Sequence, residues 1–215
     1  MQNVFEKIME LKPETWAILV SLIAMAVLLI LFRKKWNTRM LAYAAICIAI
    51  GFVLSCIRLY RMPQGGSVTP GSMFPVMLFS WAFGPTAGIT ASVAYGLLQL
   101  LQDFYAMHPV SLIMDYVLAF GMLGLTGFFK KNLTLGIFVA GVGRWLWHFL
   151  SGFIFFAEYA WEGWNPVPYS AVYNLSVIGP DLLICIALSL IPRVKRFAET
   201  FRNNAQPIVR ESSRK

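Results

Sequence analysis

The most constraining feature of this 215-residue chain is a series of apolar stretches, each close to 20 residues long and almost free of charge. A helix of that length crosses the roughly 30 Å of hydrocarbon in a lipid bilayer. Charged residues make up 13% of the chain, about half of the roughly 25% found in soluble domains, and the mean hydropathy is +0.65. The sequence therefore predicts an all-α, polytopic membrane protein.

Seven spans are predicted, at residues 15–32, 40–58, 72–84, 86–102, 110–128, 133–156 and 169–191. The first is too long for the apolar part of a signal peptide and no basic segment precedes it, so it is interpreted as a true span. The stretch "FGPTAG" separates the third span from the fourth, because Gly84 and Pro85 favour a tight turn between helices. The polar C-terminal stretch "RNNAQPIVRESSRK" is predicted to be disordered.

The basic residues predict the orientation of these spans, because cytoplasmic loops carry an excess of lysine and arginine. Thirteen of the 18 basic residues fall in the segments 33–39, 130–131 and 193–215, which alternating spans bring to one side. The N-terminus is therefore predicted outside and the C-terminus in the cytoplasm. The net charge of +8 follows from these topology signals, and nucleic-acid binding is not predicted.

Several kinds of chemistry have no support in the sequence. Cys47, Cys56 and Cys185 lie in apolar stretches without C-x-x-C spacing, so neither a disulfide nor a metal site is predicted. The two histidines, His108 and His148, lie on different elements and give no metal cluster. The chain lacks a G-x-x-x-x-G-K phosphate loop, so it is not expected to hydrolyse ATP by that route, and no cofactor is predicted.

Polar residues gather near the predicted outer ends of the spans. Asp115 lies a few residues into its span, where an ionisable acid is costly unless it is paired or hydrated. Arg144 and His148 lie at i and i+4 on one face of the sixth span, and Gly152 continues that face outward. A structural role is the alternative for each: Arg144 as the ion-pair partner of Asp115, and His148 as a hydrogen-bonding group.

The predicted outer loops are rich in aromatic residues and glycines, and Asn174 lies about a turn below Tyr169 at the start of the last span. Tyrosines and tryptophans at helix ends are also typical of the membrane interface, which is the alternative reading of these rings. Asp181 lies deeper and is interpreted as serving helix packing or partner contact. An acid, several rings and glycines together suggest a pocket for a small, flat ligand that is cationic or carries an amine.

Three segments carry a resemblance to a known family. They are "GGS" ahead of a proline-containing helix, "LIMDYVLAFGMLGLTG" around Asp115, and "HFLSGFIFFAEYAWEGWNPVPYSAVYN", which begins at His148. Over roughly residues 39–192 the chain resembles the ThiT (YuaJ) family, the thiamine-specific S-components of energy-coupling factor (ECF) transporters.

The resemblance implies a six-helix, substrate-binding core at 39–192, in the plasma membrane of a bacterium. This core captures thiamine from outside for ATP-driven uptake, together with the scaffold subunit EcfT and two ECF ATPases. Residues 1–38 then form an extra N-terminal transmembrane helix with a basic linker, and residues 193–215 form a basic cytoplasmic tail.

The resemblance also implies contacts with the ligand. The family's acidic residue, which meets the aminopyrimidine of thiamine, corresponds to Asp115. The other implied contacts are Gly66, Tyr105, Tyr116, His148, Gly152, Phe156, Tyr169 and Asn174. One relative in the family has Glu at the position of Asp115, Trp at that of Phe156, and a further Trp in its first loop. Other rings of this chain, such as Tyr60, Trp161 or Trp164, are therefore candidates for stacking.

Ala45 and Ala49 lie at i and i+4 on the first core helix, and small residues at this spacing allow close helix approach in lipid. The resemblance implies that this face docks EcfT, and internal packing is the alternative.

Two other functions are alternatives. An autonomous secondary transporter for a small cationic heterocycle usually shows repeat symmetry and midplane ionisable groups on broken helices, and neither is clear here. A membrane enzyme would use His148 and Asp115 as base and orienter, but Ser151 has no nucleophile motif around it. The chain is therefore not expected to be an enzyme.

Overall fold

The computed structural model describes residues 36–63, 65–102 and 109–214, and the predicted span at 15–32 lies outside them. The unit that begins at residue 34 is described on its own. Its elements in chain order are α3 (Thr38–Cys56), β1 (Tyr60–Arg61), β2 (Ser67–Val68), α4 (Phe74–Phe83), α5 (Pro85–Gln102), α6 (Pro109–Leu112), the π-helical turn η1 (Ile113–Leu118), α7 (Ala119–Gly121), the 3₁₀ segment η2 (Met122–Phe128), α8 (Leu133–Phe155), the 3₁₀ turn η3 (Ala157–Tyr159), α9 (Pro166–Leu190) and α10 (Pro192–Arg214).

The six predicted spans within the described residues each coincide with a helix or a continuous helical series. Four of these, α3, α8, α9 and the series from Val110 to Phe128, are long and apolar enough to cross a membrane. The predicted turn between the third and fourth spans is confirmed: Gly84 has φ +96° and donates its N–H to the Ser80 carbonyl at 2.8 Å, and Pro85 begins α5. The prediction of an all-α, polytopic membrane protein is confirmed.

Asparagine side chains begin three of the long helices. Asn37, Asn132 and Asn165 cap α3, α8 and α9, each accepting a hydrogen bond from a backbone N–H in the first turn. Such caps satisfy donors that have no partner within the helix. The three caps fix where the helices begin after their connecting segments.

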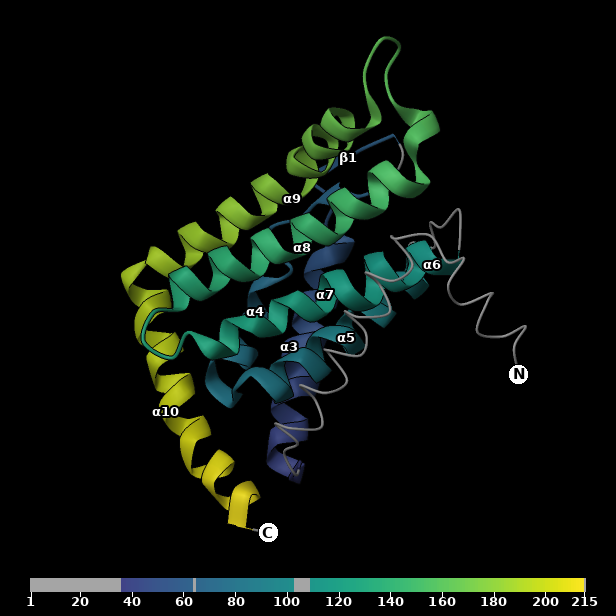
Figure 1. Ribbon diagram of the computed structural model, residues 1–215. Helices are drawn as coiled ribbons and strands as arrows, with labels where there is room; N and C mark the ends of the chain where they lie inside the picture. The colour runs from purple at the N-terminus through teal and green to yellow at the C-terminus, as the bar shows by residue number, and fades with distance from the viewer. Residues whose placement is uncertain (1–35, 64, 103–108, 215) are drawn as a thin grey trace, which may run out of the picture. The chain divides into compact units, whose positions relative to one another are not determined.

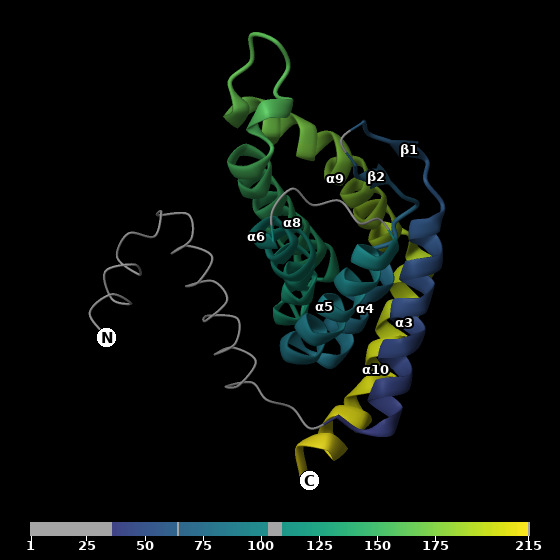
Figure 2. The same ribbon diagram turned by 90° about the vertical axis from the view of Figure 1, so that its right-hand side faces the viewer.

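The short helix α4 forms the centre of the unit. Every residue from Gly71 to Ser80 is buried, and α4 packs against α3, α5, η2 and α10. Figures 1 and 2 show α8 and α9 running side by side along another face, which agrees with their close packing. A helix that is apolar all round is expected to be enclosed in this way.

Large apolar side chains also point outward from the unit, and this is the pattern expected where lipid is the solvent. On α3, Leu41, Ile46 and Val53 are exposed, and on α9, Leu175 and Leu183 are exposed. These surfaces face away from the core that α4 organises.

The prediction of a disordered C-terminal stretch is wrong, because α10 is helical from Pro192 to Arg214. Its apolar residues Ala198, Ala205 and Ile208 are buried against α3 and α4. They recur at helical spacing, so burial of one face stabilises a segment whose composition is otherwise polar. The Asn37 side-chain amide also donates to the Ile208 carbonyl at 3.1 Å.

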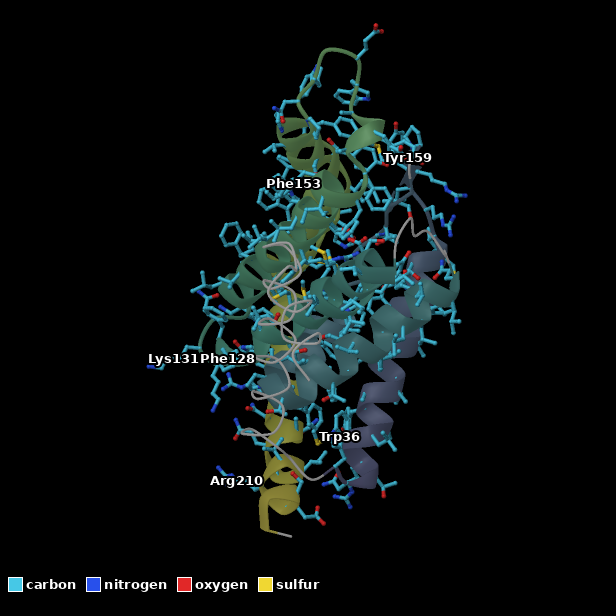
Figure 3. All side chains as sticks on the ribbon, turned by 45° about the vertical axis from the view of Figure 1, so that its right-hand side comes forward. Trp36, Phe128, Lys131, Phe153, Tyr159 and Arg210 are labelled. Carbon is cyan, nitrogen blue, oxygen red and sulfur yellow. The ribbon has the colours of Figure 1, made fainter. Side chains whose placement is uncertain are left out.

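Two of the basic segments, the turn at Lys130 and Lys131 and the helix α10, are in contact. Arg202 of α10 donates to the Lys130 carbonyl in the turn before α8, and its guanidinium lies 4.6 Å from the centre of the Trp81 ring. Figure 3 shows Lys131 and Arg210 toward this end, and Tyr159 toward the opposite end, where the β1–β2 hairpin lies. The sequence likewise assigned Lys130, Lys131 and the C-terminal segment to one side.

Candidate functional site

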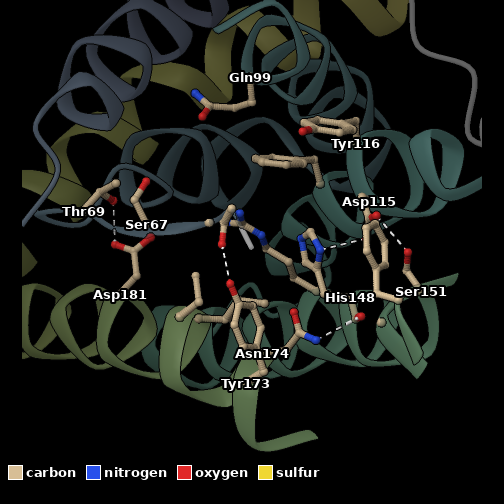
Figure 4. A pocket seen from close by; sticks show the side chains of 18 of the residues that line it. Ser67, Thr69, Gln99, Asp115, Tyr116, His148, Ser151, Tyr173, Asn174 and Asp181 are labelled. Atoms are coloured by element: carbon tan, nitrogen blue, oxygen red, sulfur yellow. Dashed lines mark hydrogen bonds and ion pairs between the residues drawn. The ribbon is translucent and has the colours of Figure 1, made fainter. Parts of the chain in front are cut away.

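A cavity lies between α5, η1, α8, α9 and the β1–β2 hairpin (Figure 4). It encloses about 190 Å³, whereas one water needs roughly 10–15 Å³ by the same measure. Its lining follows α9 from Tyr169 to Asp181, a rise of about 18 Å at 1.5 Å per residue. The space therefore suits an elongated small molecule.

One end of the cavity, called the Asp115 end, is built by Asp115, His148 and Ser151. The Nδ1 atom of His148 lies 2.9 Å from Oδ1 of Asp115, and the Ser151 hydroxyl donates to Oδ2 at 2.8 Å. The two residues on α8 therefore hold both carboxylate oxygens of the residue on η1 (Figure 4). The alternative in which Arg144 pairs with Asp115 is not what the structure shows, because the carboxylate pairs with His148.

This arrangement defines what His148 presents to the cavity. The Asp115 carboxylate can accept a hydrogen bond from Nδ1 of His148, and in the neutral tautomer that carries its proton on Nδ1 the Nε2 atom is an acceptor. Nε2 is buried and has no hydrogen-bond partner among the described residues. A buried acceptor without a partner lowers the stability of a protein, so binding of a ligand that donates a hydrogen bond to this atom would be favoured.

The backbone around Asp115 departs from a regular α-helix. Asp115 lies in the π-helical turn η1, and such turns are frequent at functional sites. Helix α5 approaches this turn so closely that a Cβ at Gly96 would lie 2.1 Å from the Tyr116 carbonyl oxygen. Only glycine fits at that crossing, and the close crossing positions η1 against the cavity.

Another wall of the cavity is formed where α8 packs on α9. The Asn174 amide donates to the His148 carbonyl at 3.2 Å and the Ser170 hydroxyl to the Phe149 carbonyl at 2.8 Å. A Cβ at Gly152 would lie 2.2 Å from the Ser170 hydroxyl oxygen, so glycine allows this approach. Asn174 and Gly152 therefore line the cavity and also hold its wall together.

Aromatic side chains line the cavity along its whole length: Tyr95, Tyr116, Phe120, Phe156, Tyr159, Tyr169 and Tyr173. The Tyr169 hydroxyl is buried without a hydrogen-bond partner among the described residues. The structure places Tyr60, Trp161 and Trp164 outside the lining, all three exposed. Trp161 instead packs its ring edge-to-face against Tyr169 from outside, with 5.2 Å between ring centres.

The β1–β2 hairpin closes one side of the cavity with its backbone. Gly66 has φ +80° and a Cβ there would lie 3.2 Å from Val177 on α9, so this turn requires glycine. The Tyr173 hydroxyl donates to the Gly65 carbonyl at 2.8 Å, which ties the hairpin to α9.

The other end of the cavity, called the Asp181 end, contains Asp181, Arg144 and Thr69. Oδ1 of Asp181 accepts from the Thr69 hydroxyl at 2.9 Å and from the Gly71 N–H at 3.1 Å. The Arg144 guanidinium lies 4.2 Å from the centre of the Phe120 ring. Figure 4 shows Asp181 and Asp115 on opposite sides of the cavity.

Most residues predicted for the site come together in this one cavity. Those that line it are Gly66, Asp115, Tyr116, His148, Gly152, Phe156, Tyr169 and Asn174. Tyr105 lies outside the described residues, and Ala45 and Ala49 are on the exposed face of α3. The sequence did not single out Tyr95 and Gln99, although their i, i+4 spacing on one span is a signal, and it assigned Asp181 to helix packing or partner contact; all three line the cavity.

The described residues contain no group of three or more His, Cys, Asp or Glu side chains that could hold a metal ion. Nor does the Asp115 end have the connectivity of a nucleophile–base pair, in which the hydroxyl bonds to the imidazole. Ser151 donates to the carboxylate instead. The geometry is that of a binding site with fixed hydrogen-bonding groups.

Comparisons with known proteins agree on one family. A family model described as thiamine transporter protein (Thia_YuaJ) matches residues 41–200. The thiamine transporter ThiT of Bacillus subtilis (strain 168) is 34% identical over 148 residues, which cover 60% of this chain and 77% of that protein. A solved structure of ThiT from Listeria monocytogenes aligns with a TM-score of 0.64 at 24% identity, covering 80% of this chain and 98% of that one.

Proposed function

We propose that this chain, which belongs to the Thia_YuaJ family of thiamine transporter proteins, is a membrane subunit that binds thiamine for uptake. The family match spans most of the chain and contains every described residue of the cavity lining. In this proposal the cavity receives thiamine from outside the cell, and the protein binds its substrate without chemically changing it.

One observation supports this proposal above the others: His148, whose Nε2 has no partner among the described residues and whose ring is held by Asp115, lines a ligand-sized cavity. Thiamine carries an amino group on its pyrimidine ring, and this group donates hydrogen bonds. We assign that amino group to Nε2, with Asp115 orienting the imidazole through Nδ1. The buried Tyr169 hydroxyl offers a second polar contact.

The charges of the lining also suit thiamine. The charged side chains that line the cavity are Asp115, Asp181 and Arg144, a formal charge of −1 with His148 neutral. Thiamine carries one positive charge, on its thiazolium ring, so the two would neutralise each other. Tyrosine and phenylalanine faces along the lining add favourable contacts with a flat cation.

Transport is proposed to depend on an ECF module of the scaffold subunit EcfT and two ATPases. Ala45 and Ala49 lie on the exposed face of α3, where their small side chains allow another helix to approach closely in lipid. We propose that EcfT docks on this face. Replacing both alanines with leucine should abolish uptake and leave thiamine binding unchanged.

The proposed topology places the N-terminus outside and the C-terminus in the cytoplasm of a bacterial cell. Residues 39–192 are the substrate-binding core, 1–38 an extra transmembrane helix with its basic linker, and 193–215 a basic cytoplasmic segment. The packing of the Lys130 turn on α10, which brings two basic segments together, supports a common cytoplasmic side.

Titration of the purified protein with thiamine, followed by tryptophan fluorescence, tests the proposal. We expect quenching at submicromolar thiamine without added ATP or sodium, because Trp161 packs on the lining residue Tyr169. Binding that requires sodium would favour an autonomous secondary transporter. Uptake that persists in cells lacking the ECF ATPases would contradict the assignment to an ECF system.

A further inference from the structure

A group of exposed basic side chains lies where η2 and α9 end and where α8 and α10 begin. Its members, which we call the basic patch, are Lys130, Lys131, Arg193, Lys195 and Arg196. The Thr134 hydroxyl oxygen lies 2.8 Å from that of Ser189, so the start of α8 contacts the end of α9. The turn before α8 and the first turn of α10 are therefore neighbours.

Packing within the protein holds the turn that carries two of these lysines. The Trp81 indole N–H donates to the Phe129 carbonyl at 3.0 Å, and the Arg202 guanidinium donates to the Lys130 carbonyl. Both bonds engage backbone groups of the turn, while the side chains of Lys130 and Lys131 remain exposed. The turn thus presents two cations on a fixed backbone, which lowers the cost of ordering them around a ligand.

The basic patch has no counter-charge among the described residues. None of its five side chains forms an ion pair within that part of the chain. The nearest acid along α10 is the exposed Glu199, one turn after Lys195, and it forms no ion pair with a described residue either. Several like charges close together repel one another, so an anion that lies among them is favoured.

Exposed apolar side chains lie directly beside the basic patch. Phe128, Leu190, Ile191 and Phe197 are between 44% and 63% exposed, and each is within three residues of a member of the patch. Figure 3 shows Phe128 and Lys131 at the same edge of the unit. In a membrane protein, a change from exposed apolar to exposed basic side chains is expected where acyl chains give way to headgroups.

We propose that the basic patch binds the headgroups of anionic phospholipids, whose acyl chains cover Phe128, Leu190 and Phe197. A phosphodiester accepts charge-assisted hydrogen bonds from lysine and arginine, and the lipid tails match the apolar neighbours. This lipid site is separate from the cavity, because no member of the patch lines it. Bound lipid would hold the first turn of α10 at the membrane surface.

Native mass spectrometry of the purified full-length protein, with short-chain lipids added to the detergent, tests the proposal. Phosphatidylglycerol is the anionic probe, and phosphatidylcholine with the same acyl chains is the zwitterionic one. We expect wild-type protein to bind phosphatidylglycerol at least about tenfold more tightly, because several basic residues act together. Glycerol phosphate carries the anion without the tails and should compete at least about tenfold less effectively than phosphatidylglycerol.

Two double variants remove charge from the two segments of the patch. One combines Lys130→Gln with Lys131→Gln, and the other combines Lys195→Gln with Arg196→Gln. Each should lower the preference for phosphatidylglycerol over phosphatidylcholine at least about fivefold, since each basic residue near a membrane surface adds to the attraction. Thermal unfolding without added lipid checks that both variants are folded.

The matched control combines Arg39→Gln with Arg210→Gln, two exposed arginines outside the patch. It changes the net charge by the same amount and should leave the lipid preference unchanged. A control that loses as much preference as the patch variants overturns the proposal, because net charge alone would then attract the lipid.

Equal binding of the two lipids by wild-type protein also overturns the proposal, and that comparison needs no variant. Wild-type preference in both patch variants overturns it as well. Competition by glycerol phosphate as strong as that by phosphatidylglycerol would identify a site for free anions and would overturn the assignment to lipid.

Discussion

The two ends of the cavity hold their carboxylates in different ways. At the Asp115 end, the carboxylate contacts His148 and Ser151, and both of its oxygens are engaged. At the Asp181 end, one carboxylate oxygen binds Thr69 and Gly71, while the nearby cation remains apart. Both carboxylate oxygens are therefore bound at the first end, whereas at the second end no described residue bonds to Oδ2 of Asp181.

The two ends therefore differ in what they offer a ligand: the Asp115 carboxylate is fully engaged within the protein, whereas the Asp181 carboxylate keeps one oxygen available as an acceptor. A preassembled pair presents a fixed acceptor, which saves the ligand the cost of ordering side chains. A carboxylate oxygen without a partner, such as Oδ2 of Asp181, instead gains a hydrogen bond only from a group that donates. Predictions that disturb each end separately follow, in order of decreasing effect.

Removing either member of the Asp115–His148 pair should have the largest effect on thiamine binding. Asp115→Ala and His148→Ala are each expected to weaken it at least about tenfold, because hydrogen bonds to charged groups contribute about 1.5–3 kcal/mol. The loss of binding free energy in the double variant should be smaller than the sum of the two single losses, because both substitutions remove the same Asp115–His148 contact. Isothermal titration with thiamine measures all three, with the exposed Glu158→Ala as control. Wild-type affinity in both single variants would remove these residues from the site.

Ser151→Ala should have an intermediate effect, because it removes one of the two hydrogen bonds to Asp115 and leaves the imidazole contact. We expect thiamine affinity to fall about fivefold, or about 1 kcal/mol. The same titration measures it, and Ser176→Ala, whose hydroxyl bonds to its own helix, serves as the control. An effect as large as that of Asp115→Ala would mean that Ser151 does more than orient the carboxylate.

Thr69→Val, at the Asp181 end, should change thiamine affinity by less than about threefold. The Gly71 N–H still holds Oδ1 of Asp181, so the carboxylate stays in place when the Thr69 hydroxyl is lost. Titration of both Thr69→Val and Ser151→Ala with thiamine compares directly how much each end of the cavity contributes to thiamine affinity. If Thr69→Val were the more damaging of the two, the Asp181 end would contribute more to orientation than we expect.

Arg202→Ala should leave both ends of the cavity unaffected. Its guanidinium contacts the Trp81 ring and the Lys130 carbonyl, away from the cavity lining. We expect thiamine affinity to be unchanged and the free energy of unfolding to fall by about 1 kcal/mol. Thermal unfolding in detergent measures this, with the exposed Arg210→Ala as control. A change in thiamine affinity would show that α10 influences the cavity.

The sequence was sufficient to predict the helices of the core, because apolar length is a strong signal when lipid is the solvent. It also singled out Asp115, since an acid within a span requires a partner or water. The identity of that partner was not predictable. Arg144 and His148 share one helical face, and the choice between them depends on how η1 is turned toward α8.

Other features escaped the sequence reading for different reasons. The polar composition of the C-terminal segment favours disorder, but Ala198, Ala205 and Ile208 recur at helical spacing and are buried. The sequence does not show that Asp181 and Arg144 line the same cavity, because they lie on different helices. Only the packing of α8 on α9 brings them together.

The packing of α10 has a consequence for assembly. Its buried residues cover the side of α3 that carries Met40, Ala44 and Cys47. On the described part of the chain, Ala45 and Ala49 stay uncovered on the outer side of α3. In the assembly proposed above, EcfT would therefore meet α3 on its outer side, and the C-terminal segment would restrict the docking angle without having to touch EcfT.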